Sequence, residues 1–301
     1  RKALINLDDF FKSILDIDTL LQCILENGSG HQPFFCNNII KYSLLTKRWG
    51  YAEELIRKEK ERRSDWSIST LWVEKHKELC QGDTGHRGFS VSWDSSLLGR
   101  RAASQGVKIF SKEWDEHMSK YASTDLLYQE NQSWIFDNIP NNIEGTLDYK
   151  DDSWDFMSAY YYRSGMVAAV SMKVKEILED MNISKEEYTL IPIRIKDSNT
   201  QYYLMFIKSI GHNEINFSNS LYQKIIGDDE YRKFASYSEF SDSTDWYTIA
   251  FPVLPQKYAK RDLIYIQNGR ETYMSARLIK AFREAGIKGI EFKAIGSLRF
   301  I

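Results

Sequence analysis

One pattern occurs twice in this sequence, and it limits the possible folds more than any other feature. In each copy a short apolar run ends in a serine, and an amphipathic helical stretch with one basic residue in its first turn follows. The copies are Val170–Leu178, with Ser171, and Met274–Phe282, with Ser275. Serine is favoured at a helix N-cap because its hydroxyl accepts a backbone N–H of the first turn. The pattern predicts a strand–helix–strand unit used twice around one sheet.

The rest of the C-terminal region alternates between strand-like and helix-like segments. Period-2 apolar patterns predict strands, and Pro192 favours an edge position or a bulge for its strand, because proline cannot donate to a ladder. A helix is expected around 112–122. The expected strands are 89–93, 188–195, 202–207, 262–266 and 289–293. We therefore expect an α/β domain (an α+β fold with one mixed sheet) over residues 82–301.

The first 81 residues read as a separate helical region. Apolar residues recur at helical spacing over 8–27 and over about 38–63, with a break expected at Trp49–Gly50. The two stretches are loosely similar, which favours degenerate helical-hairpin repeats with a third hairpin near 67–79. An ordinary helical cap on the next domain explains them equally well. The Gly-rich segment Gln81–Gly88 is the expected linker.

The order of the motifs in the C-terminal region resembles a known family. Ser275 and its basic helix are followed by Gly286, Gly289, Ile290 and Phe292, in a Gly-x-x-Gly-hydrophobic-x-Phe pattern. Together with Val170-Ser171, Ile191-Pro192-Ile193 and Tyr202-Tyr203-Leu204, this is similar to the eleventh family of bacterial polymorphic-toxin immunity proteins, known from contact-dependent and type VI secretion loci. The resemblance covers roughly residues 120–301. It implies an immunity protein that neutralises a secreted toxin.

Composition limits the compartment and the partners. The net charge of −2 argues against a generally basic, nucleic-acid-binding surface. No apolar run approaches the ~18 residues of a membrane-spanning helix. Asp8 and Asp9 come too early for the apolar part of a signal peptide, and the three cysteines are too few for a disulfide framework. We expect a cytoplasmic protein that binds neither nucleic acid nor membrane.

Catalytic, metal and cofactor motifs are weak in this sequence. Cys80 and His86 lie in a Gly-rich segment without an evident third residue to orient the imidazole. The cysteines lack the close Cys-x-x-Cys spacing of zinc sites, and no phosphate-binding glycine loop is present. We therefore expect no catalytic residue, no metal and no cofactor. A hydrolase that uses clustered carboxylates remains an alternative function.

Acidic residues lie beside tryptophans in two loop-like segments. Carboxylates attract a basic partner and speed association, whereas tryptophan is frequent among the residues that dominate interface energies. The residues expected to bind the partner are Asp151, Asp152, Trp154, Glu239, Asp242, Asp245 and Trp246. The leading hypothesis is stoichiometric inhibition of a cognate toxin. The alternatives are a helical-repeat adaptor and the acid-cluster hydrolase.

Overall fold

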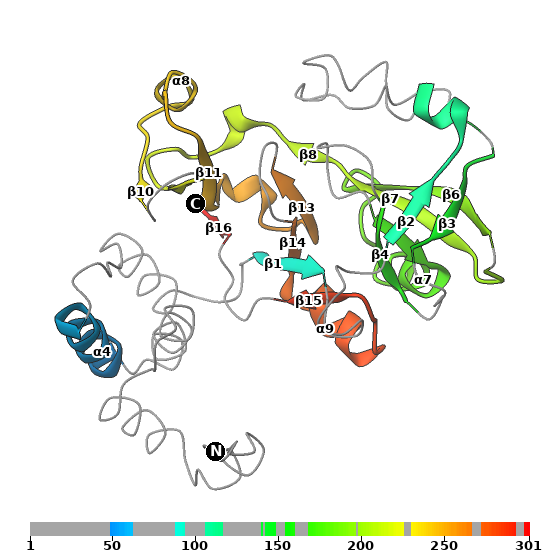
Figure 1. Cartoon of the computed structure of the whole chain (residues 1–301), viewed down its shortest axis with the longest axis horizontal. Helices are drawn as coiled ribbons and strands as arrows, with labels where there is room; N and C mark the ends of the chain where they lie inside the picture. The colour runs from blue at the N-terminus through cyan, green and yellow to red at the C-terminus, as the bar shows by residue number, and fades with distance from the viewer. Residues whose placement is uncertain are drawn as a thin grey trace, which may run out of the picture. The chain divides into compact units, whose positions relative to one another are not determined.

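The chain divides into two compact units. The computed structural model describes residues 49–62, 88–93, 106–116, 140, 142–148, 154–159, 168–196, 198–225, 230–266, 272–292 and 298–301. One unit contains residues 1–82 and 229–231, and the other contains 83–228 and 232–301 (Figure 1). The predicted division between 81 and 82 lies next to the first of these boundaries.

The described part of the first unit is mainly one helix, α4 (Trp49–Arg62). It lies within the predicted 38–63 stretch, but the residues before Trp49 are outside the described ones, so the break expected at Trp49–Gly50 stays a prediction. Ala52 and Leu55 are buried, whereas Arg57 pairs with Glu54 and Glu61 on the exposed face. The predicted helix 8–27 and the third hairpin lie outside the described residues, so the repeat hypothesis stays a prediction.

The second unit contains a closed six-stranded barrel. Its strand order is β2-β3-β6-β7-β5-β4. Most neighbours are antiparallel, but β2–β4 and β3–β6 are parallel. Its core includes Trp114, Trp154 and Tyr202, all at most 2 % exposed. The strands are β2 (Gly106–Ile109), β3 (Glu144–Leu147), β4 (Phe156–Ala159), β5 (Ala168–Ser171), β6 (Tyr188–Lys196) and β7 (Tyr202–Ile207).

A five-stranded sheet forms the middle of the second unit. Its order is β15-β1-β14-β13-β8, and its pairs are antiparallel except β13–β8. The strands are β15 (Ile290–Phe292), β1 (Gly88–Trp93), β14 (Thr272–Ser275), β13 (Leu263–Ile266) and β8 (Ser209–Ile210). Leu263 and Tyr265 face one hydrophobic core and Ile264 and Ile266 face another, so β13 is buried on both faces.

An aromatic lobe packs on the second of those cores. It contains a three-stranded sheet in the order β10-β9-β11, a parallel pair β12–β16, and helix α8. Tyr222, Phe234, Phe240 and Tyr247 pack ring to ring at centroid distances of 5.1–5.4 Å. The elements are β9 (Leu221–Lys224), β10 (Tyr231–Arg232), α8 (Tyr237–Ser241), β11 (Tyr247–Phe251), β12 (Val253–Leu254), β16 (Arg299–Phe300) and the 3-10 turns η4 (His212–Glu214) and η5 (Gln256–Tyr258).

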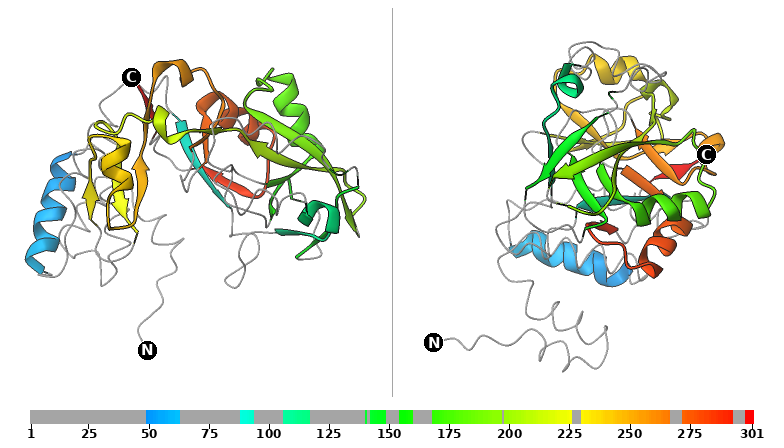
Figure 2. Two further views of the ribbon diagram at one scale, coloured as in Figure 1. Left: turned by 90° about the horizontal axis from the view of Figure 1, so that it is seen from above. Right: turned by 90° about the vertical axis from the view of Figure 1, so that its right-hand side faces the viewer.

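The twice-used unit predicted from the sequence is present, but not around one sheet. Helices α7 (Met172–Asp180) and α9 (Ala276–Glu284) follow β5 and β14, with Ser171 and Ser275 as N-caps. β5 belongs to the barrel and β14 to the five-stranded sheet, so the prediction of a single sheet is wrong. The two strand–serine–helix copies still share one hydrophobic core, and α7 and α9 are neighbours (Figure 2).

The two strand–serine–helix copies match in more detail than the sequence pattern indicated. An aspartate stands just before the strand that pairs with the first strand of each: Asp155 before β4 and Asp262 before β13. Its side chain accepts a hydrogen bond from the hydroxyl of the capping serine. Two positions after the last residue of each nine-residue helix stands a residue with positive φ, Asn182 at 54° or Gly286 at 65°. Such a residue ends a helix by turning its last N–H groups back onto the final carbonyls. The same local chemistry therefore builds both units.

The predicted edge position of Pro192 is also corrected. β6 is an internal barrel strand, and Pro192 is paired with Tyr203 of β7. On its other side the ladder with β3 begins only at Arg194, whose N–H donates to Ile143. The missing proline N–H points to that side, two residues before the ladder starts, so no sheet hydrogen bond is lost.

Among the helices that the structure describes, none combines enough length with enough apolar character to cross a bilayer.

Candidate functional site

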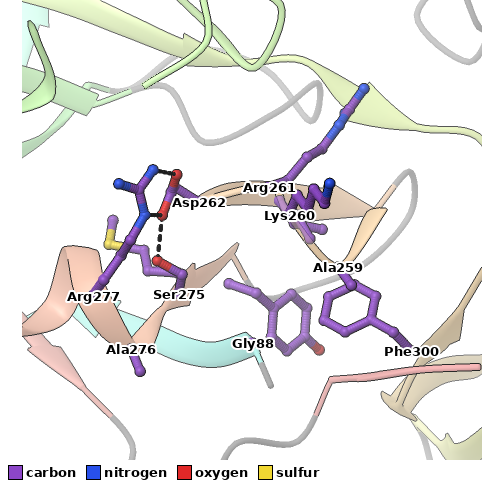
Figure 3. Close-up of a pocket in the computed structure, with 12 residues that line it drawn as sticks. Gly88, Ala259, Lys260, Arg261, Asp262, Ser275, Ala276, Arg277 and Phe300 are labelled. Atoms are coloured by element: carbon purple, nitrogen blue, oxygen red, sulfur yellow. Dashed lines mark hydrogen bonds and ion pairs between the residues drawn. The ribbon is translucent and has the colours of Figure 1, made fainter. Parts of the chain in front are cut away.

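A pocket opens beside the N-terminus of α9, on the aromatic-lobe face of the five-stranded sheet (Figure 3). Its volume is about 360 Å³, within the range of pockets that hold small molecules. Tyr273 and Ile264 of the sheet contribute apolar surface. The full lining is Gly88, Ala259, Lys260, Arg261, Asp262, Ile264, Tyr273, Met274, Ser275, Ala276, Arg277 and Phe300.

The second Asp–Ser–helix unit forms one wall of this pocket. Asp262 stands just before β13, and Ser275 ends the neighbouring antiparallel strand β14. The Ser275 hydroxyl donates to Asp262 Oδ1 at 2.5 Å and accepts the N–H of Leu278 at 3.3 Å. Both roles of the hydroxyl are structural, because they fix the start of α9 against the sheet.

Arg277 completes this wall with an ion pair. Its guanidinium donates two hydrogen bonds to the Asp262 carboxylate, from Nε at 2.7 Å and from Nη2 (Figure 3). Nη1 donates to the carbonyl of Met181 at the end of α7. The Asp262 side chain is only 3 % exposed, and the hydrogen bond to it raises the pKa of Arg277. The pair therefore neutralises a buried carboxylate and also links α9 to α7.

A second buried acid, Glu187, lies behind the same wall. Its Oε2 accepts the backbone N–H groups of Asp262 and Leu263 at 2.8 and 2.9 Å. Burial raises the pKa of the Glu187 carboxyl, while those two N–H donors act in the opposite direction. Glu187 precedes barrel strand β6, so this carboxylate connects the barrel to the five-stranded sheet.

The pocket has the chemistry of a binding site for a negatively charged group. Lys260 and Arg261 add two positive charges to the neutralised Arg277–Asp262 pair. Asp262 is the one carboxylate in the lining, whereas a glycosidase-type site needs two. Among the residues that the structure describes, no group of three or more side chains could hold a metal ion.

Trp154, which the sequence predicted at a partner-binding surface, lies in the barrel core. Its side chain is 2 % exposed and its carbonyl accepts the Tyr202 hydroxyl at 3.2 Å. This burial corrects the prediction, because a side chain in the core cannot contact a partner. Asp151 and Asp152, its predicted neighbours in the interface, lie outside the described residues.

The predicted acids of the lobe are exposed or partly exposed, and each has an intramolecular partner. Glu239 accepts the N–H of Ala235 and pairs with Arg232, and these contacts lower the pKa of the Glu239 carboxyl. Asp242 accepts the Ser238 hydroxyl at the end of α8. Asp245 pairs with Lys224 at 3.1 Å. These contacts hold the acids in place around α8 and β11.

Trp246, by contrast, is 69 % exposed. Its carbonyl accepts the N–H of Ile225, whose side chain is 38 % exposed. We call Trp246 and Ile225, with the adjacent Asp245–Lys224 pair, the Trp246 surface. It joins two of the predicted residues, Asp245 and Trp246, to an apolar neighbour that the sequence did not single out.

The pocket residues were missed in the sequence, although two signals were available. The basic residue in the first turn of each copied helix, Lys173 or Arg277, was part of the pattern. The unused signal was the Lys260-Arg261-Asp262 run directly before a strand. When two consecutive strands pair antiparallel, the start of the first strand lies beside the end of the second. An acid before the first strand therefore meets a capping serine at the end of the second.

Together the fold and these sites define an α+β protein with a barrel and two candidate binding regions. A scan with protein-family models finds no model that matches this chain, and a search of curated proteins finds no match either.

Proposed function

We propose that this chain is a stoichiometric inhibitor of the immunity class, which binds a toxin domain through the Trp246 surface. The observation that carries the proposal is the exposure of Trp246, 69 %, beside a second exposed apolar side chain. Tryptophan is costly to leave in water, and a partner that covers it gains a large contact area with little loss of side-chain freedom.

The charges around Trp246 support a basic partner. Asp242 lies four residues before it in the chain, is exposed and has no ion-pair partner among the described residues, whereas the charge of Asp245 is balanced by Lys224. Acids beside an aromatic anchor steer a cationic partner into contact, while the anchor slows its release. The resemblance of the Ser275–Phe292 segment to an immunity family points to the same class of partner.

The test is binding to the C-terminal toxin domain of a secreted protein encoded beside this chain. Trp246→Ala is expected to raise the dissociation rate about tenfold or more, as loss of an interface anchor does. Phe110→Ala is the matched control, because Phe110 is another exposed aromatic residue, on the barrel. Surface plasmon resonance measures both, beside a cell-protection assay.

The outcomes separate the class of function from the surface. Equal dissociation rates for Trp246→Ala and the parent chain would place the toxin elsewhere on the molecule. Failure of every toxin domain of that locus to bind the parent chain would refute the immunity proposal itself.

A further inference from the structure

We propose that the pocket beside α9 binds a small organic anion, with the charged phosphate or carboxylate group at the Lys260 end and an apolar body against Tyr273 and Phe300. The pocket lies outside the Trp246 surface, so the inference goes beyond the proposed toxin binding. It rests on the amphipathic lining of the cavity and on donors within it that have no partner in the described residues.

The apolar part of the pocket comes from one face of the sheet. Ile264, Tyr273 and Ser90 are opposite one another on β13, β14 and β1, so their side chains lie on the same face. Ile264 and Tyr273 line the pocket, and Phe300 lies across it from Arg277 (Figure 3). A planar or aliphatic group fits against these side chains. A bare inorganic ion would leave this surface unused.

The polar part combines free cationic and neutral donors. Lys260 is exposed, and its ammonium group has no hydrogen-bond or ion-pair partner among the described residues. Arg261 extends from the same turn, over the ring of Tyr258 at 4.9 Å. Ala276, the first residue of α9, lines the same pocket, and its N–H has no acceptor in the described part of the chain. Helix N-termini favour negative charge through such N–H groups.

A buried hydroxyl lies near the pocket on the same face of the sheet, although it is not part of the lining. Ser90 is 0 % exposed, and its Oγ has no hydrogen-bond partner in the part of the chain that the structure describes. Buried hydroxyls usually have partners, because leaving one unpaired costs free energy. Ser90 lies next to Tyr273 on the pocket face of the sheet, two residues along β1 from the lining residue Gly88.

The existing charges of the wall do not oppose an anion. Asp262 is the only carboxylate in the lining, and both of its oxygens accept hydrogen bonds from Arg277. With that pair neutral, Lys260 gives the pocket a positive charge, whereas the Arg261 side chain points away from the other lining residues (Figure 3). An anion held by several charge-assisted hydrogen bonds binds more strongly than a neutral molecule of the same shape.

The experiment titrates the whole chain with four probes by isothermal titration calorimetry. Phenyl phosphate and benzoate carry both a ring and an anionic group. Inorganic phosphate lacks the ring and benzyl alcohol lacks the charge. We expect phenyl phosphate or benzoate to bind at least about fivefold more tightly than either incomplete probe. The tighter of the two identifies the anionic group as phosphate or carboxylate.

Two substitutions are chosen to remove one donor each from the pocket. Lys260→Gln removes the free charge and is expected to weaken binding about five- to tenfold. Ala276→Pro removes one N–H, and proline is well tolerated at the first helical position. The extended Ser275 backbone, at φ −69° and ψ 156°, is already compatible with a following proline. We expect this variant to bind about threefold more weakly or worse.

Lys280→Gln is the matched control, because it removes the same charge from α9 away from the pocket, where Lys280 pairs with Glu284. It is expected to change binding less than about twofold. Circular dichroism melting checks that each variant is folded. The proposal is overturned if no anionic probe saturates below ~10 mM, if benzyl alcohol binds as tightly as the anions, or if Lys280→Gln weakens binding as much as Lys260→Gln.

Discussion

At the scale of single residues, two glycines of the Gly-x-x-Gly segment have different structural requirements. Gly286 has φ 65° and no atom within 4 Å of the place where a Cβ would stand. Gly289 has φ 104°, and a Cβ there would lie 2.0 Å from the carbonyl oxygen of Phe156. The first glycine satisfies a conformational preference. The second also permits a close approach between the chain before β15 and strand β4.

The two glycines should therefore respond differently to alanine. We expect Gly286→Ala to lower the free energy of unfolding by about 1 kcal/mol, the cost of a left-handed alanine. Gly289→Ala should lower it by more than about 3 kcal/mol, because the backbone of β4 must move. Urea denaturation measures both. Equal losses would mean that the contact with Phe156 relaxes at little cost.

At the scale of elements, the two Asp–Ser–helix units differ in one contact. Arg277 of α9 is paired with the buried Asp262. Lys173 holds the equivalent position in α7, and it is exposed and has no ion-pair partner among the described residues. Asp155, the counterpart of Asp262, instead accepts the N–H of Lys288 at 3.0 Å.

This difference predicts unequal effects of the same substitution. Arg277→Met should cost about 2 kcal/mol of unfolding free energy, since it leaves the Asp262 carboxylate buried without its cation. The loss stays below that of a fully buried pair because the Arg277 side chain is 57 % exposed. Lys173→Met should change stability by less than about 0.5 kcal/mol. Thermal and urea denaturation measure the unfolding free energy of both variants. Similar losses of stability would contradict a structural role for the Arg277–Asp262 pair.

At the scale of the whole second unit, Glu187 connects the barrel to the five-stranded sheet. Asp262, Arg261 and Arg277 are the charged groups that act on it. Burial raises its folded-state pKa above the ordinary value of 4.5. Between the unfolded and folded pKa values the native state binds more protons. The contribution of Glu187 to stability is therefore complete below pH 4.5 and is lost as the pH rises through the folded pKa.

Glu187→Gln removes this titration and keeps an oxygen that can accept the two N–H groups. The stability of the parent chain relative to this variant should fall as the pH rises above 4.5 and through the raised folded-state pKa of Glu187, and then level off. Unfolding free energies of both chains across that range are the measurement. A parent chain that gains stability over the variant with rising pH would show that Arg261 and Arg277 outweigh burial.

Much of the local structure could be predicted from the sequence. The N-caps Ser171 and Ser275 and strand β7 depend on residues within a few positions of one another. The candidate site was harder to predict from the sequence. Trp154 and Trp246 occupy similar acidic contexts in sequence, yet one lies in the barrel core and the other is 69 % exposed.

What the sequence alone determined, then, is the repeated unit: a strand, a capping serine, and a short helix with a fixed end. Only the tertiary structure decided that one copy joins a barrel and the other a separate sheet, and that Lys260, Asp262 and Arg277 surround a pocket. The physical reason is the range of the interactions. Caps and turns are satisfied by neighbours in the chain, whereas strand pairing and burial depend on partners such as β1 and β14, which lie far apart in sequence.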